Sequence, residues 1–391
     1  MKLGFPKGFL WGAATSSHQV EGNNHNDWTE WELKNAERLS KESGGKYPPE
    51  NFISGRACDH YNRFREDFDI AKSLNHNAHR FSIEWSRIEP EEGKWDEKEI
   101  EHYREVISAL RERGIEPFVT LWHWTLPLWV AKQGGWENKK TVEDFTKYSE
   151  RMAKEFGDIK YWITINESKI YSINTHLRGK WPPQKRTLPG ALKTYRNILL
   201  AHKRVYSKIH RAGVNVGIAK NNSYFEGWAS PLVNYLWNDW FLKRIKNHQD
   251  FIGLNYYFHN RIRGFKFNQN ENKKISDFGW EIYPEGIYYV LKDLKKYNKP
   301  IYITENGLAD AKDIYRADFI KEHLRWTHKA ISEGVDVRGY LHWSLLDNFE
   351  WHQGFWPRFG LVEMDYKTME RRIRQSATVY AKIAKENLLE V

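Results

Sequence analysis

The sequence predicts a single (β/α)8 barrel, or TIM barrel, that spans residues 1–391. Eight short β-rich runs are each followed by a longer stretch with helical spacing of apolar residues. Several of the runs are almost continuously apolar, which is typical of parallel strands that are covered on both faces. Two doubly wound domains would need a linker rich in Pro, Gly or Ser near the middle of the chain, and the sequence has none there.

The predicted elements alternate from one end of the chain to the other. The first helix shows the pattern well, because Ala57, Tyr61, Phe64, Phe68 and Ala71 form one apolar stripe at helical spacing. The expected strands are 9–14, 78–85, 116–122, 161–165, 214–220, 251–257, 300–304 and 339–345. The other expected helices are 97–113, 141–156, 189–212, 231–247, 286–297, 316–333 and 371–388.

Composition excludes several classes of protein. The net charge of +10 comes from basic residues spread along the whole chain, so we expect an ordinary solvated surface and no nucleic-acid partner. No run approaches the roughly 18 apolar residues of a membrane-spanning helix, and the first residues do not read as a signal peptide. The single cysteine, Cys58, excludes an internal disulfide framework. We therefore expect a cytoplasmic protein with no membrane partner.

Tryptophan is unusually frequent, with 19 residues in the chain. Packing of the core and of the helix–strand interfaces accounts for about half of them. The flat indole rings that remain are suitable platforms for the apolar faces of sugar rings. The composition thus favours a carbohydrate ligand before any motif is considered.

Polar residues close the predicted strands, at the end of the barrel where the chemistry of such folds lies. Glu167 ends the fourth strand and Glu305 ends the seventh, so the two carboxylates face each other across the barrel mouth. Side chains from other strand ends surround them, namely Gln19, Arg80, His123, Asn255, Tyr257 and Glu350.

Two facing carboxyl groups are what hydrolysis of a glycosidic bond requires. One must hold a proton while the other is ionised. Arg80 would keep Glu305 ionised, and apolar neighbours would raise the pKa of Glu167. Taken alone, each residue has an ordinary structural interpretation: a glutamate at a strand end is often a helix cap or an ion-pair partner, and His123 could be a buried structural histidine. The combination of strand ends favours a glycosidase.

The chain also resembles a known family. Residues 5–22, FPKGFLWGAATSSHQVEG, are similar to the N-terminal signature of glycoside hydrolase family 1, the β-glucosidase family. Other motifs of that family follow in order, as RFSI at 80–83, WHW at 122–124, NE at 166–167, NYY at 255–257, ITENG at 303–307 and WSLLDNFEW at 343–351. The resemblance covers the whole chain.

The resemblance implies an exo-acting retaining β-glycosidase that uses double displacement. The expected activity is that of a β-glucosidase, and β-galactosidase and β-fucosidase activities are further possibilities. Glu305 would be the nucleophile, oriented by Arg80 and Tyr257, and Glu167 would be the acid/base. Small β-glycosides or short β-linked oligosaccharides would be the substrates, with no metal and no cofactor. The substrate-binding residues would be Gln19, His123, Trp124, Asn166, Asn255, Trp343, Glu350, Trp351 and Phe359.

The chain departs from the family pattern in three places. Ser168 follows Glu167 where the family usually has proline, so we expect a more mobile backbone there. Thr125 stands where the family commonly has aspartate. The segments 218–249 and 308–316 lack residues that members usually have, which shortens the rim around the leaving-group side of the site.

Three related functions are alternatives to a β-glucosidase. A 6-phospho-β-glycosidase would need cations and hydroxyls where Glu350 stands, and a thioglucosidase would lack the acid at position 167. A sugar-binding protein without activity would be expected to have lost one of the two glutamates. The sequence contains no HExxH, GxSxG, Walker or GxGxxG motif that would favour another chemistry.

Overall fold

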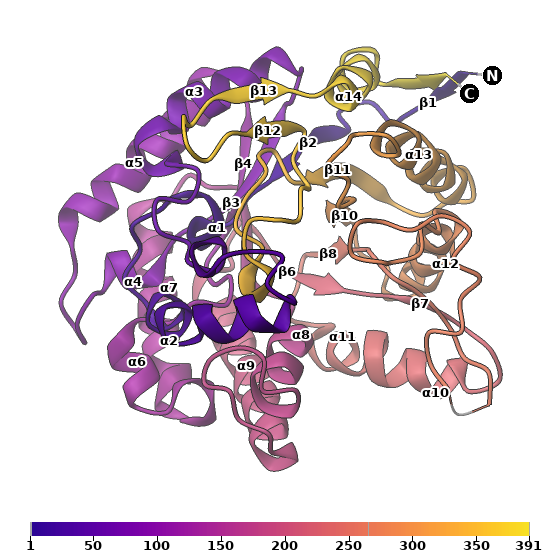
Figure 1. Cartoon of the computed structure of the whole chain (residues 1–391). Helices are drawn as coiled ribbons and strands as arrows, with labels where there is room; N and C mark the ends of the chain where they lie inside the picture. Colours follow the sequence, from indigo (N-terminus) through magenta and orange to yellow (C-terminus); the bar gives the residue numbers. More distant parts are fainter. Residues whose placement is uncertain (1, 265, 391) are drawn as a thin grey trace.

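The computed structural model describes residues 2–264 and 266–390, and its centre is a closed barrel of eight parallel strands (Figure 1). Neighbouring strands pair in chain order, and the barrel closes where Gly339 of the last strand pairs with Leu10 of the first. The strands are β2 (Leu10–Ala14), β3 (Ala78–Ser82), β4 (Glu116–Thr120), β5 (Tyr161–Asn166), β6 (Asn215–Asn221), β8 (Phe251–Asn255), β10 (Ile301–Asn306) and β11 (Val337–Trp343). The predicted fold is confirmed, and each strand overlaps its predicted run.

Helices surround this barrel. α5 shows why they form: Asp96 caps its N-terminus by accepting from the N–H groups of Lys98 and Glu99, while Ile100, Ile107 and Leu110 are buried. The larger helices are α3 (His60–Ser73), α5 (Glu97–Glu112), α7 (Lys140–Glu155), α9 (Leu188–Ile209), α12 (Glu285–Leu294), α13 (Arg316–Ser332) and α14 (Gln375–Glu386). None of the described helices is both long and apolar enough to cross a membrane.

Two predicted helices differ from the structure. The helix expected at 231–247 is divided into α10 (Ser230–Asn234), the π-helix η4 (Tyr235–Asp239) and α11 (Trp240–Ile245). The helix expected at 371–388 begins only at Gln375, because β13 (Arg371–Ile373) pairs with β12 (Val362–Met364). At 371–373 pairing with a distant strand overrides the local helical pattern, whereas residues 230–245 stay helical throughout and only the hydrogen-bonding pattern changes within η4.

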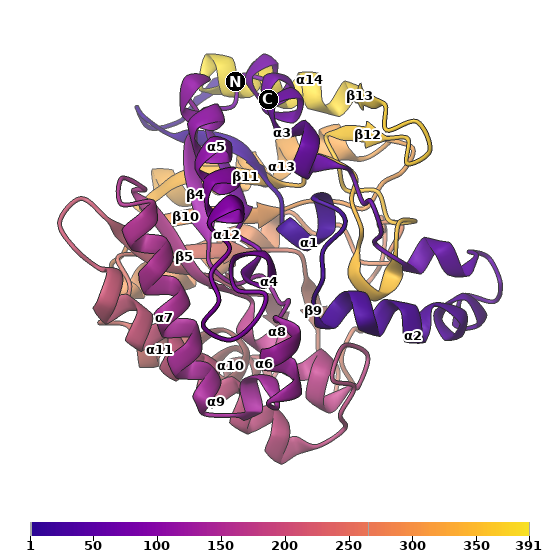
Figure 2. The ribbon, with the colours of Figure 1, turned by 90° about the vertical axis from the view of Figure 1, so that its left-hand side faces the viewer.

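The sequence pattern did not predict the helix α2 (Asp27–Glu42), which lies between the first two strands of the barrel in the chain. α2 follows β2 and begins at Asn26, whose side chain caps it. Figure 2 shows α2 on the right, away from α7 and α11 on the left. Short elements complete the chain, namely α1 (Ser17–Val20), η1 (Pro49–Phe52), α4 (Trp85–Ile88), α6 (Leu128–Lys132), η2 (Gly135–Glu137), α8 (Ser168–Ser172), η3 (Ile173–Leu177), β7 (Tyr224–Glu226), β9 (His259–Arg261), η5 (Lys295–Tyr297) and η6 (Trp351–Gln353).

The two ends of the described chain are hydrogen-bonded to each other. β1 (Lys2–Gly4) pairs antiparallel with β14 (Leu388–Glu390), and Figure 1 shows the termini side by side. Because residues 2–4 precede β2, this pair lies at the end of the barrel where the strands begin.

Aromatic rings fill the lower half of the barrel. Phe118, Tyr161, Phe251 and Tyr302 come from four different strands and pack against one another, with the Phe118 and Tyr161 ring centroids 4.3 Å apart. These rings leave the polar side chains to the other end, where the strands finish. The barrel interior is therefore apolar where the strands begin and polar at the mouth, where they end. We call the four rings the aromatic floor.

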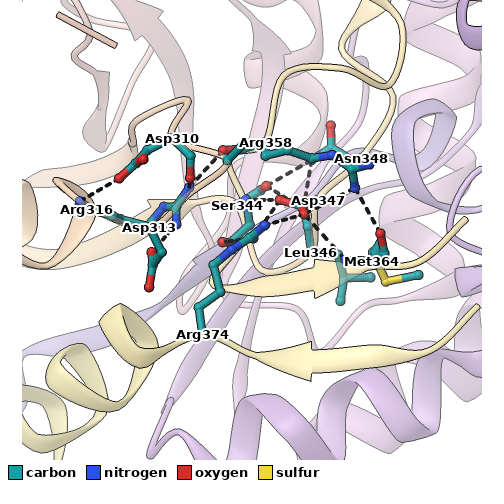
Figure 3. Close-up of polar contacts among 12 residues, drawn as sticks. Asp310, Asp313, Arg316, Ser344, Leu346, Asp347, Asn348, Arg358, Met364 and Arg374 are labelled. Carbon is teal, nitrogen blue, oxygen red and sulfur yellow. Dashed lines mark hydrogen bonds and ion pairs between the residues drawn. The ribbon is translucent and has the colours of Figure 1, made fainter. Parts of the chain in front are cut away.

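A buried ion-pair network ties the loops after β10 and β11 to α14 (Figure 3). Both guanidinium nitrogens of Arg374 lie 2.8 Å from the carboxylate of Asp347, which also accepts from the N–H of Gly360 at 2.8 Å. Arg316 donates to the backbone oxygens of Asp310 and Arg358 at 2.6 and 2.8 Å. The network holds the segment that carries Glu350 and Phe359 at the mouth.

Replacing Asp347 by Asn should lower the free energy of unfolding by about 3–5 kcal/mol, because it leaves the buried Arg374 cation without its counter-charge. Urea unfolding followed by fluorescence measures this change. Asp336→Asn is the matched control, since the exposed Asp336–Arg338 pair should contribute only about 0–1 kcal/mol. Equal stability of the two variants would contradict a stabilising role for the network.

Candidate active site

A cavity of about 700 Å³ opens at the mouth of the barrel. Ten of the residues that we expected to form the site line it, from the ends of six strands and the loops that follow them, namely Gln19, His123, Trp124, Glu167, Tyr257, Glu305, Trp343, Glu350, Trp351 and Phe359. The other three, Arg80, Asn166 and Asn255, are fully buried directly behind this lining. The structure therefore brings all the predicted site residues together.

Glu305, in β10, is held by two groups from other strands. Arg80 of β3 places Nη1 2.5 Å from Oε1, and the hydroxyl of Tyr257 donates to Oε2 at 2.8 Å. Arg80 is itself fixed, because its Nη2 donates to Asn166 Oδ1 and its Nε to Thr120 Oγ1. The carboxylate can therefore rotate little.

Glu167 follows β5 and precedes α8, and its backbone has a left-handed φ of 45°. Its N–H donates to the carbonyl of Ala219 on the neighbouring strand, which fixes the turn. Backbone of this kind in a non-glycine residue is uncommon and clusters at functional sites. It aims the side chain into the cavity.

Two amides contact the Glu167 carboxyl. Asn255 Nδ2 lies 2.8 Å from Oε1, and Asn221 Nδ2 lies 3.3 Å from the same oxygen. The sequence analysis missed Asn221, although the pair Asn221-Asn222 closes the fifth predicted strand and was the signal available. Asn255 also donates to Asn166 Oδ1 at 3.1 Å, so one amide joins the ends of β5 and β8.

The two carboxyl groups have different electrostatic surroundings. Burial, and then the nearby charge of Glu305, raise the pKa of Glu167 to about 8. Burial also raises the pKa of Glu305, but the charge of Arg80 and the hydrogen bonds from Tyr257 and Arg80 oppose that effect. Glu305 is therefore the carboxyl that ionises first, and Glu167 is the one that keeps its proton.

Further polar groups form the closed end of the cavity. Gln19 donates to Glu350 Oε2 at 3.3 Å and to the carbonyl of Phe349 at 2.9 Å. Burial, and then the charge of Glu305, raise the pKa of Glu350 to about 8. His123 accepts from Asn166 Nδ2 at 3.0 Å, and burial and the Arg80 charge hold the pKa of His123 well below its usual range. A neutral imidazole and a protonatable carboxyl thus face the same space.

Indole rings surround these groups. The ring of Trp351 is nearly parallel to that of His123, with the centroids 6.1 Å apart. Trp124 packs against Trp351 and donates its Nε1–H to the backbone oxygen of Asn166 at 2.9 Å. Trp343 and Phe359 belong to one buried cluster with Tyr257. The closed end of the cavity is therefore flat-walled and aromatic, with hydrogen-bonding groups between the rings.

The structure accounts for two of the departures from the family pattern. Thr125 donates its hydroxyl to both oxygens of Glu84 at 3.0 Å, and Glu84 is a fully buried carboxylate from the neighbouring strand end. Aspartate at position 125 would bring a second carboxylate against it. Ser168 is buried and is the first residue of α8, so a helix and not a mobile loop follows Glu167.

Comparison with known proteins decides the family. The model of glycosyl hydrolase family 1 matches residues 1–235 and 237–389. The chain belongs to glycosyl hydrolase family 1. Membership confirms the prediction that this chain is a glycoside hydrolase of the β-glucosidase type. Retention of the anomeric configuration is general in this family.

Relatives of this family-1 chain include Beta-glucosidase A of Thermotoga maritima, 37% identical with 99% of each chain covered. Beta-galactosidase of Sulfolobus acidocaldarius is 31% identical over 98% of this chain and 96% of the relative. Among solved structures, a β-glycosidase from Pyrococcus horikoshii has a TM-score of 0.92 at 40% identity, covering 100% of this chain and 97% of that one. The alignment with the T. maritima protein runs over 452 positions, so that relative carries segments that these 391 residues lack.

Replacing Thr125 by Asp should lower the free energy of unfolding by about 3 kcal/mol at pH 7, because two buried carboxylates would repel each other. Urea titrations measure this loss. Thr125→Ser keeps the hydroxyl and serves as the control; a Thr125→Asp protein as stable as this control would contradict the account of Glu84.

Proposed function

We propose that this chain releases terminal β-D-glucosyl residues from small β-glycosides and short β-linked oligosaccharides, with β-D-galactosyl or β-D-fucosyl residues as further substrates. In this proposal Glu305 is the nucleophile and Glu167 is the acid/base. The observation that carries it is the pair of buried carboxyls on β10 and at the end of β5, one held by a guanidinium and the other by amides.

In the first step the Glu305 carboxylate attacks the anomeric carbon while Glu167 gives its proton to the glycosidic oxygen, and the leaving group departs as an alcohol. In the second step Glu167, now ionised, takes a proton from water, and the hydroxide oxygen displaces Glu305 from the anomeric carbon. Two inversions retain the configuration. The Arg80 guanidinium and the Tyr257 hydroxyl position Glu305 for both steps.

The closed end of the cavity would hold the terminal sugar. Gln19, His123, Glu350 and Trp351 would bind its 3-, 4- and 6-hydroxyl groups, Asn166 its 2-hydroxyl, and Trp343 would stack beneath the ring. Trp124, Asn255 and Phe359 complete the proposed glycone site. T. maritima β-glucosidase has been solved with deoxynojirimycin and other sugar-like inhibitors, which supports a site of this kind.

Glu350 favours a neutral sugar over its 6-phosphate. A phosphate carries about −1.5 to −2 charges, and here it would enter the cavity that holds the Glu305 carboxylate, with the Glu350 carboxyl and no cation among the groups proposed to bind the 6-hydroxyl. Repulsion would therefore add to any mismatch of shape. We also propose that the enzyme acts in the cytoplasm without a metal or cofactor and without a nucleic-acid or membrane partner.

The two glutamates should fail differently when they are replaced. Glu305→Ala should abolish turnover of every β-glycoside, whereas Glu167→Ala should lose about 10²- to 10⁴-fold with poor leaving groups and far less with dinitrophenolates. Initial rates on a series of aryl β-glucosides measure this. Glu363→Ala, an exposed residue of β12, is the control. Equal losses for good and poor leaving groups at position 167 would remove it from the role of acid.

The dependence of kcat/KM on pH should be bell-shaped. Activity falls at high pH as Glu167 loses the proton that its raised pKa retains at neutrality, which places the alkaline midpoint near 8. It falls at low pH as Glu305 becomes protonated. Since the pKa of Glu350 is also about 8, Glu167→Ala assigns the alkaline limb. With an activated aryl glucoside that limb should disappear in Glu167→Ala, and its persistence there would transfer it to another group.

A further inference from the structure

Two lysines lie beside Glu167 and have no part in the proposed mechanism. Lys169 belongs to α8 and comes two residues after Glu167. Lys220 is in β6, next to Asn221, whose amide contacts the Glu167 carboxyl. Lys220 is only 1% exposed, which is rare for a lysine, and Lys169 is half-buried.

Both ammonium groups bind the same backbone oxygen. Nζ of Lys220 lies 3.0 Å from the carbonyl oxygen of Trp237, and Nζ of Lys169 lies 3.1 Å from that same oxygen. Lys220 also donates to the carbonyl of Asn221, and Lys169 to that of Leu236. Trp237 is the middle residue of the π-helix η4, so this helix is attached to the two elements that adjoin Glu167.

The attached residue forms part of the catalytic cavity. Trp237 lines it together with Phe225 and Val233, which come from β7 and α10. Its ring packs edge-on against Phe225 with the centroids 6.1 Å apart, and Lys169 Nζ lies 5.0 Å from its centre. Because Glu167 must meet the leaving-group oxygen, the wall beside Glu167 faces the leaving group and not the terminal sugar.

Neighbouring contacts fix the rest of η4. Asn238 exchanges two hydrogen bonds with the backbone of Ser223, at 3.1 and 2.8 Å. Asp239 accepts from Lys296 and from Tyr297, both at 2.7 Å. Trp237 differs from these neighbours. In the described residues, the side chains that donate to its carbonyl oxygen are those of the two lysines alone.

Holding a buried and a half-buried amine at the same oxygen costs free energy, because both amines are partly removed from water. Burial lowers the pKa of Lys169 to about 6 and that of Lys220 to about 7. At Lys220 the charges of Glu167 and Asp239 oppose this effect. Each amine can donate to a carbonyl in either protonation state, so the contact with Trp237 persists when a proton is lost.

We infer that Lys169 and Lys220 are positioning residues that clamp Trp237 against the leaving group and so determine which leaving groups this enzyme accepts. The inference rests on the proposed function. It also explains how a shortened rim works, because Trp237 in the shortened segment is held by side chains from β6 and α8 in place of additional chain.

The test uses Lys169→Met and Lys220→Met, which keep the length of the side chain and remove its donors. Lys246→Met, an exposed lysine at the C-terminal end of α11 in the same segment, is the matched control. KM and kcat are measured on dinitrophenyl, nitrophenyl and alkyl β-glucosides and on cellobiose. The inhibition constant of 1-deoxynojirimycin, a sugar-like inhibitor without a leaving group, reports on the glycone site alone.

Both clamp variants should raise KM about tenfold for substrates with large leaving groups. The inhibition constant of deoxynojirimycin should change less than about twofold. The value of kcat on the dinitrophenyl glucoside should also change less than about twofold, because its leaving group departs before the slow hydrolysis of the glycosyl-enzyme. A structural defect would instead move all three quantities together, and that result, or an unchanged KM, would overturn the inference.

Trp237→Leu provides a second route if a buried lysine variant does not fold. It removes the indole and leaves both lysines in place, and it should reproduce the same pattern of raised KM with an unchanged inhibition constant. If Trp237→Leu shows no selectivity among leaving groups, the clamp has no such role. A wild-type protein inactive on every β-glycoside would refute the proposed function instead, so the two failures are distinguishable.

Discussion

A guanidinium inside a protein must be paired, because removing its charge from water costs several kcal/mol. Arg80 is fully buried in the barrel and meets this constraint by binding Glu305, Asn166 and Thr120, which come from three different strands. Asn166 is oriented in turn, since its oxygen accepts from Arg80 and its nitrogen donates to His123. The position of one cation thus sets the direction of the polar groups around the cavity.

The aromatic floor makes this polar layer possible. Phe118, Tyr161, Phe251 and Tyr302 fill the barrel where its strands begin, so the charged groups at the other end lie in surroundings of lower effective dielectric constant than water. In such surroundings the same geometry makes the pKa values of the two carboxyls differ by more than it would in water. The difference between Glu305 beside Arg80 and Glu167 among amides is therefore a product of the core as much as of the site.

The sequence predicted the eight strands because each combines an apolar run with a polar end, and that combination also located Glu167 and Glu305. It did not predict contacts between distant segments. Arg371–Ile373 has a helical pattern but pairs with β12, and the helical pattern at 231–247 does not reveal that its middle residue Trp237 contacts Lys169 and Lys220. Asn221 and Lys220 were missed for the same reason, since an amide or a lysine near a strand end does not reveal its burial or its partner.

The pairing of β1 with β14 turns the polypeptide into a nearly closed loop. Since the pair lies where the barrel strands begin, a short peptide could join the two ends without crossing the cavity, and new ends could be opened in an exposed loop elsewhere. The same geometry suits attachment to a solid support, because either end would tether the molecule by the face opposite the mouth. The cavity would then remain open to dissolved sugars.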